Sequence, residues 1–143
     1  GVTIELGNCE DAQLDRKFDM VVMLEVIEHV DNLAIAIKNL LDHLKPGGEL
    51  VMTTPNATHI GNVIDAFLRR PAKVFYQHVT VFTPEHCQAF CDRHDLDLIE
   101  AEYFTFDATG GLSMRIKTVI IRAFGWISPR LHSSFAVTIR KRG

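Results

Sequence analysis

The sequence of 143 residues contains no Gly-x-Gly motif, few cysteines and no long uncharged apolar run. The missing Gly-x-Gly argues against an oxidoreductase that binds a dinucleotide through such a loop. No run approaches the roughly 18 apolar residues that a membrane-spanning helix requires. The chain starts at Gly1 without an initiator methionine or an apolar leader. We therefore expect a fragment or processed product of a cytoplasmic protein.

Cysteine is represented by only three residues, Cys9, Cys87 and Cys91. A small odd number is typical of a reducing compartment, where disulfides are rare. Cys87 and Cys91 are four residues apart, so both lie on one face if their segment is helical. Because no further cysteine supports a metal site, we interpret this pair as part of a buried helix face.

Acidic residues are absent from the last part of the chain. All 18 lie at or before Asp107, whereas the residues from Ala108 onward include seven basic ones. The basic tail either contacts an anionic partner or packs against the acidic part of its own chain. We favour the second interpretation. Nucleic acid is not the expected partner, because no set of aromatic residues suited to base stacking accompanies the charge.

The residues that are present predict an α/β domain. Met20–Leu24 is a continuous apolar run bounded by charged residues, which is typical of a central parallel strand. Further strands are expected at residues 2–6, 49–53, 96–105 and 134–140. Helices are expected over residues 33–44, 60–69, 84–94 and 112–126, the first ended by Lys45-Pro46-Gly47-Gly48. The succession of strand, helix and strand predicts a right-handed βαβ unit.

The segment that follows the buried strand is rich in groups that carry chemistry. Glu25 and Glu28 are three residues apart, so one helical turn would place them on one face, with His29 next to them. Two carboxylates and an imidazole form a mixed oxygen and nitrogen site suited to Mg²⁺, Mn²⁺ or Zn²⁺. His29 can instead act as a base or substrate contact without metal. The acidic pair can also be a solvated helix start.

The order of these motifs resembles the class I S-adenosylmethionine-dependent methyltransferases, in particular the subgroup with the ubiquinone-biosynthesis O-methyltransferases. The resemblance is carried by Phe18–Val30, by Leu44-Lys45-Pro46-Gly47-Gly48, by Thr54-Pro55-Asn56 and by His78–Glu85. It covers residues 1–105 and the last strand. It implies a partial Rossmann-like fold with strand order 3-2-1-4-5-7-6, in which strand 7 is antiparallel. This chain would lack the first two strands and the Gly-rich loop.

The resemblance also implies residues that bind the cofactor S-adenosylmethionine. Asn8, Cys9 and Glu10 match the turn that holds the adenine in this family. Leu24 and Glu25 match the end of the strand that lies beside the cofactor. The alternative is an ordinary polar turn at positions 8–10. Because the Gly-rich loop is missing, we expect this chain alone to bind the cofactor weakly and to leave Met20–Leu24 as an exposed apolar edge.

The catalytic residues implied by the resemblance are His29 and Glu28, and a divalent metal would be bound by Glu25, Glu28, His29 and His78. The predicted function is methyl transfer to a hydroxyl of a small-molecule acceptor. Two alternatives stay open, a non-catalytic remnant that serves as an interaction module and an RNA 2′-O-methyltransferase.

Residues 1–143 are interpreted as the C-terminal portion of one methyltransferase domain, with 108–133 as a lid or insertion segment. The apolar and basic stretch 112–131 has three possible roles. It is a lid over an apolar substrate, a peripheral membrane or lipid contact, or a plain packing helix.

Overall fold

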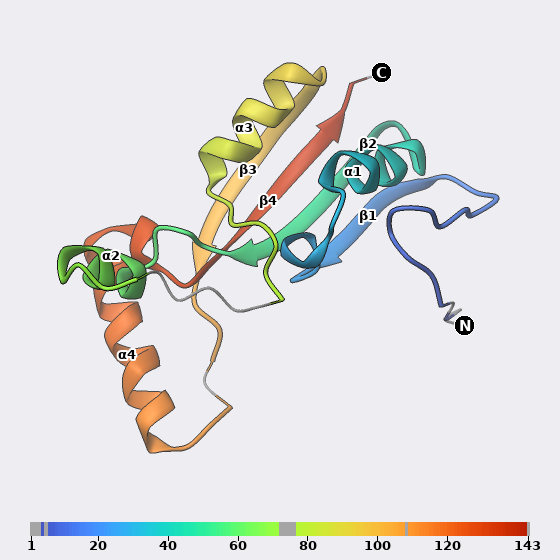
Figure 1. Ribbon diagram of the computed structural model, residues 1–143. Coiled ribbons are helices and arrows are strands. Elements are labelled where there is room, and N and C mark those ends of the chain that lie inside the picture. Colours follow the sequence, from blue (N-terminus) through green and yellow to red (C-terminus); the bar gives the residue numbers. More distant parts are fainter. Residues whose placement is uncertain (1–3, 5, 72–76, 108, 143) are drawn as a thin grey trace.

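The computed structural model describes residues 4, 6–71, 77–107 and 109–142, and a single four-stranded sheet organises them (Figure 1). The strands are β1 (Phe18–Leu24), β2 (Leu44–Pro55), β3 (Leu96–Phe104) and β4 (Ser134–Lys141). Their order is β1-β2-β4-β3; β1 and β2 are parallel, and β4 is antiparallel to both its neighbours. This arrangement confirms the order 4-5-7-6 expected for the second half of the sheet.

Helices α1 (Leu33–Asp42) and α3 (Pro84–Arg93) lie over the same face of the sheet (Figure 1). Side chains alternate between the two faces of a strand, so the residues of one face form the core. Met23 of β1, Leu50 of β2 and Val137 of β4 are buried in this core, together with Ile37 of α1 and Cys91 of α3. The expected βαβ unit β1–α1–β2 therefore forms, and its helix covers the strands that it connects.

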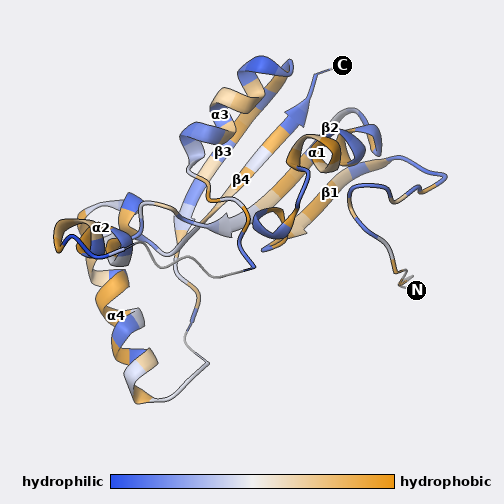
Figure 2. Ribbon diagram, in the orientation of Figure 1, coloured by the Kyte–Doolittle hydropathy of each residue, from blue (hydrophilic) through white to orange (hydrophobic). Residues whose placement is uncertain are grey.

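The opposite face of β1 is apolar and open. Met20, Val22 and Leu24 are 51%, 54% and 59% exposed, and the orange colour of β1 in Figure 2 marks the same apolar strand. The unbroken apolar run predicted a strand covered on both faces, whereas the described residues cover only one. The expected exposed apolar edge is confirmed.

Several boundaries differ from those expected. Leu44, expected at the end of the first helix, is instead the fully buried first residue of β2 and pairs with Phe18. Helix α2 (Ile60–Phe67) ends before Arg69, which has a positive φ of 53°. The strand expected at residues 2–6 lies mostly outside the described residues, and Ile4 and Leu6 belong to no strand.

The basic tail is neutralised by the acidic part of the same chain, as the favoured interpretation required. Four tail arginines form ion pairs with earlier acidic residues: Arg122 with Asp107, Arg130 with Glu85, Arg140 with Glu49, and Arg142 with Asp95 and Asp97. Exposed pairs of this kind each contribute little to stability, because water and salt screen them. Their main consequence is that most of the tail's charge is engaged within the molecule.

Helix α4 (Leu112–Ile127) projects from the end of the sheet near α2, where it shares few contacts with the core (Figure 1). Only Gly125 of this helix is buried, while Trp126 and Ile127 are 95% and 78% exposed. The described residues therefore cover little of its apolar surface. The lid, the lipid contact and the packing helix all stay predictions. Within the described residues, no helix is long and apolar enough to cross a membrane.

The two thiols of α3 lie on its buried face, as their spacing predicted. Cys87 is 7% exposed and Cys91 is fully buried. Burial raises the pKa of Cys87 to about 12 and that of Cys91 to about 11. Because the thiolate is the reactive form, both groups are inert near neutral pH. A redox or metal-binding pair requires accessible thiolates, whereas both of these thiols are buried and protonated.

This arrangement predicts the order in which the cysteines react with iodoacetamide. At pH 8 we expect Cys9, which is only half-buried, to be alkylated first. Cys87 and Cys91 should react only after denaturation, because their thiols are buried and protonated at that pH. Peptide mass spectrometry of samples taken over time checks the order. Alkylation of Cys87 or Cys91 as fast as Cys9 in the folded protein would contradict it.

Candidate functional site

The candidate site begins where β1 ends. Glu25 has a positive φ of 52°, and its backbone N–H donates to the carbonyl oxygen of Thr53 and to Thr53 Oγ1, both at 3.1 Å. The short 3-10 helix η1 (Ile27–His29) starts only two residues later. The single helical face that was to carry both Glu25 and Glu28 is therefore not formed, because the left-handed residue breaks the chain direction between them.

Glu28 is a buried carboxylate fixed from two sides. Its side chain is only 2% exposed, and Thr54 Oγ1 donates a hydrogen bond to Oε2 at 3.2 Å. Its backbone carbonyl accepts from the N–H groups of Val79 and Thr80, at 2.8 and 3.3 Å. A buried carboxylate requires a donor such as the Thr54 hydroxyl, because desolvation disfavours it strongly. Glu28 thus joins β2 to the segment that precedes α3.

His29 is held in one orientation by the same segment. Its Nδ1 lies 2.9 Å from the backbone oxygen of Gln77. A carbonyl oxygen can only accept, so Nδ1 carries the hydrogen and a neutral ring keeps its lone pair on Nε2. Nε2 lies 3.9 Å from Glu28 Oε1, and the His29 side chain is 39% exposed. The nitrogen with the lone pair therefore lies beside a buried carboxylate, on a ring that is partly exposed to solvent.

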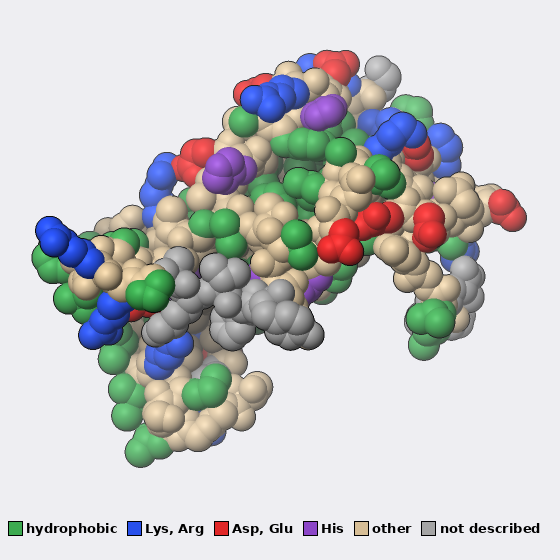
Figure 3. Space-filling view, in the orientation of Figure 1, with side chains coloured by type: hydrophobic (Ala, Val, Ile, Leu, Met, Phe, Trp, Pro, Cys, Tyr) green, Lys and Arg blue, Asp and Glu red, His purple; other side chains and the backbone are tan. Residues whose placement is uncertain are grey.

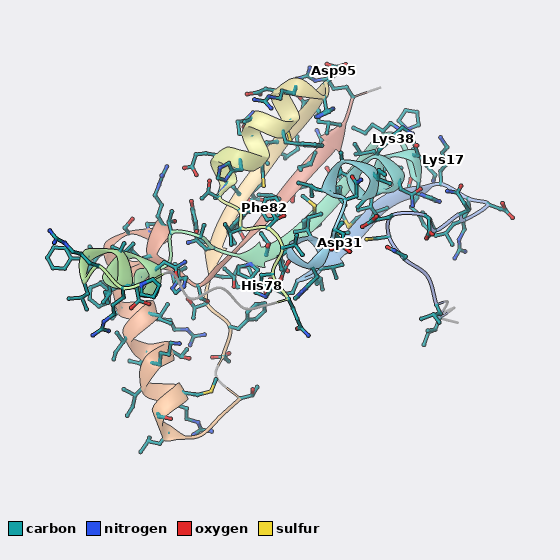
Figure 4. The ribbon with its side chains drawn as sticks, viewed as in Figure 1. Lys17, Asp31, Lys38, His78, Phe82 and Asp95 are labelled. Carbon is teal, nitrogen blue, oxygen red and sulfur yellow. The ribbon has the colours of Figure 1, made fainter. Side chains whose placement is uncertain are left out.

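His78 completes the cluster. Its ring meets that of His29 edge to face, with the centroids 4.9 Å apart, and Figure 4 shows His78 beside the end of β1. One ligand atom each from Glu28, His29 and His78 lie within 4.8 Å of one another, the one such group among the described residues. Imidazole nitrogen with carboxylate oxygen suits Zn²⁺ or Mn²⁺. The three residues fit a divalent cation in chemistry and in spacing.

Glu25 lies outside this group, although it was predicted with it. Its Oε1 is the buried side-chain atom of the described chain that has no hydrogen-bond partner. Burial raises the pKa of Glu25, opposed by the hydrogen bond with Thr53. Such an unpaired oxygen is costly, and a bound hydroxyl or amine would satisfy it. Glu25 therefore stays a candidate ligand contact, separate from the metal-type cluster.

The turn predicted to hold adenine is tied to α1. Asn8 Oδ1 accepts from the N–H of Glu10 at 3.0 Å, and Glu10 Oε1 accepts from the N–H of Asn32, the residue that caps α1, also at 3.0 Å. Asn39 Nδ2 donates to the carbonyl of Cys9 at 3.1 Å. These bonds place the turn alongside α1, from its N-cap residue Asn32 to Asn39 near its end. They engage the amide oxygen of Asn8, so cofactor binding there stays a prediction.

Sequence reasoning missed the residues that support the site. Thr54 was noted only as part of the Thr54-Pro55-Asn56 segment, yet its hydroxyl holds Glu28. Gln77 was not singled out, and no signal could have revealed it, because it acts through its backbone oxygen. Leu24, predicted beside the cofactor, is 59% exposed at the end of β1.

Comparison with protein families and known proteins gives concordant matches. The family model described as methyltransferase domain matches residues 5–101. The ubiquinone biosynthesis O-methyltransferase of Rickettsia felis is 47% identical over 49 residues, which cover 34% of this chain and 20% of that protein. The mitochondrial ubiquinone biosynthesis O-methyltransferase of Arabidopsis thaliana is 35% identical over 101 residues, covering 67% and 31%. The chain thus spans between a fifth and a third of these two relatives.

Solved structures share the fold at low sequence identity. The N-methyltransferase NodS from Bradyrhizobium japonicum, in complex with S-adenosylhomocysteine, matches with a TM-score of 0.51 and 17% identity, over 96% of this chain and 53% of that one. The [4+2]-cyclase SpnF matches with a TM-score of 0.61 and 12% identity, over 96% and 55%. These likenesses concern the fold alone, since the two proteins have different activities. The family model, which matches well over half of the residues, shows that the chain belongs to the methyltransferase domain family, among the class I S-adenosylmethionine-dependent methyltransferases.

Proposed function

We propose that this domain takes part in methyl transfer from S-adenosylmethionine to a hydroxyl of a small molecule, with His29 as the base. This proposal rests on the orientation of His29, whose Nδ1 is bound to the Gln77 carbonyl and whose Nε2 lies beside the buried carboxylate of Glu28 on a partly exposed ring. The site follows the carboxyl ends of the parallel strands β1 and β2, where open α/β sheets bind ligands.

The proposed step is an in-line displacement. The acceptor oxygen forms a bond to the methyl carbon while the bond between that carbon and the sulfonium sulfur breaks. The hydroxyl proton passes to His29 Nε2, and the products are a methyl ether and S-adenosylhomocysteine. The imidazolium that results is stabilised by Glu28 Oε1, 3.9 Å away. Glu28 therefore acts as a positioning and charge-balancing residue, held ready by Thr54.

Two findings support oxygen as the acceptor atom. Curated relatives that the chain matches are named ubiquinone biosynthesis O-methyltransferases. A hydroxyl also needs a base to remove its proton, and the structure provides an oriented imidazole. The remaining cofactor contacts that we propose are Asn8, Cys9 and Glu10 beside α1, and Leu24 and Glu25 at the end of β1.

The same cluster supports a second proposal, that Glu28, His29 and His78 hold a divalent cation. The Gln77 carbonyl fixes His29 so that Nε2 is the nitrogen available for coordination, which is a common arrangement for metal-bound histidine. A bound cation would polarise the acceptor hydroxyl and help it to lose its proton. His29 cannot then also serve as the base, so the two proposals differ in their consequences.

The base proposal is tested by His29→Ala in the full-length protein, assayed with S-adenosylmethionine and a small-molecule hydroxyl acceptor that the unaltered protein methylates. We expect the turnover rate to fall by about 100-fold or more, because general-base catalysis typically contributes that much. The affinity for S-adenosylmethionine should stay within about twofold. Added imidazole should restore part of the rate, which a merely structural role would not allow. An unchanged rate in His29→Ala would contradict the proposal.

The metal proposal is tested by calorimetric titration of the chain with Zn²⁺. We expect Glu28→Gln and His78→Ala each to weaken binding by at least tenfold, because each removes one ligand. Glu25→Gln is the matched control and should bind as the unaltered chain does, since Glu25 lies outside the cluster. Equal Zn²⁺ affinity in all four proteins would refute the site. Removal of the metal by a chelator distinguishes the two proposals. Methyl transfer should be lost if the cation is required and should persist if His29 acts as a free base.

A further inference from the structure

A cavity of about 450 Å³ lies between α1, α3 and the sheet, separate from the solvent-facing side of the His29 cluster. This volume falls within the range of about 300–1,000 Å³ that is usual for small-molecule sites. Figure 3 shows hydrophobic side chains at the surface between α3 and α1, in keeping with an opening there. The proposed methyl transfer gives this cavity no role.

The interior of the cavity is apolar. Its lining includes Ile37 of α1, Met52 of β2, Val137 of β4 and Phe90 of α3. These side chains belong to the core or pack against it, so the surrounding core residues hold them in place. An apolar cavity of this size favours a hydrocarbon or aromatic body, which leaves water when it binds.

Three basic side chains of α3 line this cavity. Arg93, His86 and His94 all line it, and all three are exposed. Nearby acidic side chains are engaged elsewhere: Asp92 accepts from Gln88, and Asp95 and Asp97 pair with Arg142.

Arg93 forms no ion pair with any other described residue. Arg93 therefore lines an apolar cavity and has no ion-pair partner among the residues that the structure describes.

The cavity lining includes three residues that adjoin or contact Glu28 of the candidate site. Ile27, Thr54 and Thr80 line it. Thr54 donates to the Glu28 carboxylate and Thr80 to the Glu28 carbonyl, while Ile27 precedes Glu28 in η1. A molecule in the cavity would thus contact the residues that fix Glu28.

We propose that this cavity binds an amphipathic carboxylate, with its carboxylate group at Arg93 and its apolar body among Phe90, Ile37 and Val137. Charge complementarity selects the anion, because a guanidinium pairs well with a carboxylate. The apolar walls select against small hydrophilic anions. The ligand would contact Thr54, which donates a hydrogen bond to Glu28, so ligand binding can shift the position of Glu28. The proposal stands whether or not the domain transfers a methyl group.

Calorimetric titration of the chain with decanoate, below its micelle concentration, tests the site. We expect saturable binding of one molecule. Arg93→Gln should weaken it about fivefold, the effect of losing one partly exposed ion pair, while Arg115→Gln on α4 should not. Decanol, which has no charge, should bind the unaltered chain and Arg93→Gln equally well.

Steric blocking provides an independent readout. Ala89 lines the cavity and is exposed on α3, so Ala89→Phe fills the opening without burying a new group in the core. We expect it to reduce decanoate binding by tenfold or more, with an unchanged circular dichroism spectrum. Gln88→Phe is the matched control, since Gln88 is exposed on the same helix and does not line the cavity. Absence of decanoate binding, or equal binding by Ala89→Phe and Gln88→Phe, would overturn the proposal.

Discussion

The buried carboxylate of Glu28 is the constraint on which the site depends. Removing a carboxylate from water is unfavourable by several kcal/mol unless hydrogen bonds compensate. Thr54 of β2 donates one such bond to the Glu28 carboxylate. Separately, the backbone carbonyl of Glu28 accepts from the N–H groups of Val79 and Thr80. The chain before α3 is therefore fixed against η1. That fixation brings the Gln77 carbonyl to His29 and the His78 ring to the same place.

One geometry thus supports two chemistries. A histidine whose Nδ1 is bound to a carbonyl has its Nε2 available for a proton or for a metal ion. The neighbouring carboxylate stabilises a positive charge in either case. The sheet contributes the location, because the parallel strands β1 and β2 end together at this point. The α1–α3 cavity lies behind the same residues, so occupancy there and the position of Glu28 are physically linked through Thr54.

Sequence patterns predicted those features that depend on local periodicity. The strands β1, β3 and β4, the helices α1 and α3 and the buried thiols follow from spacing of apolar residues and from caps. Leu44 was misplaced because its apolar side chain continues the helical stripe, while in space it fills the core from the start of β2. The left-handed Glu25 was missed, since glutamate has no preference for that conformation. The Gln77 contact depends on tertiary structure and on a backbone atom, which no side-chain pattern can show.

His29 Nε2 is the nitrogen that both proposed chemistries require to be free of hydrogen, and the tautomer of His29 can be observed directly in this chain. Long-range nitrogen–proton correlation by NMR, at a pH where the ring is neutral, distinguishes the two forms. The hydrogen bond to the Gln77 carbonyl predicts a hydrogen on Nδ1 and an unprotonated Nε2. The histidine resonance that disappears in His29→Ala identifies the residue. A ring of His29 protonated on Nε2, or an equal mixture of both tautomers, would contradict the central claim.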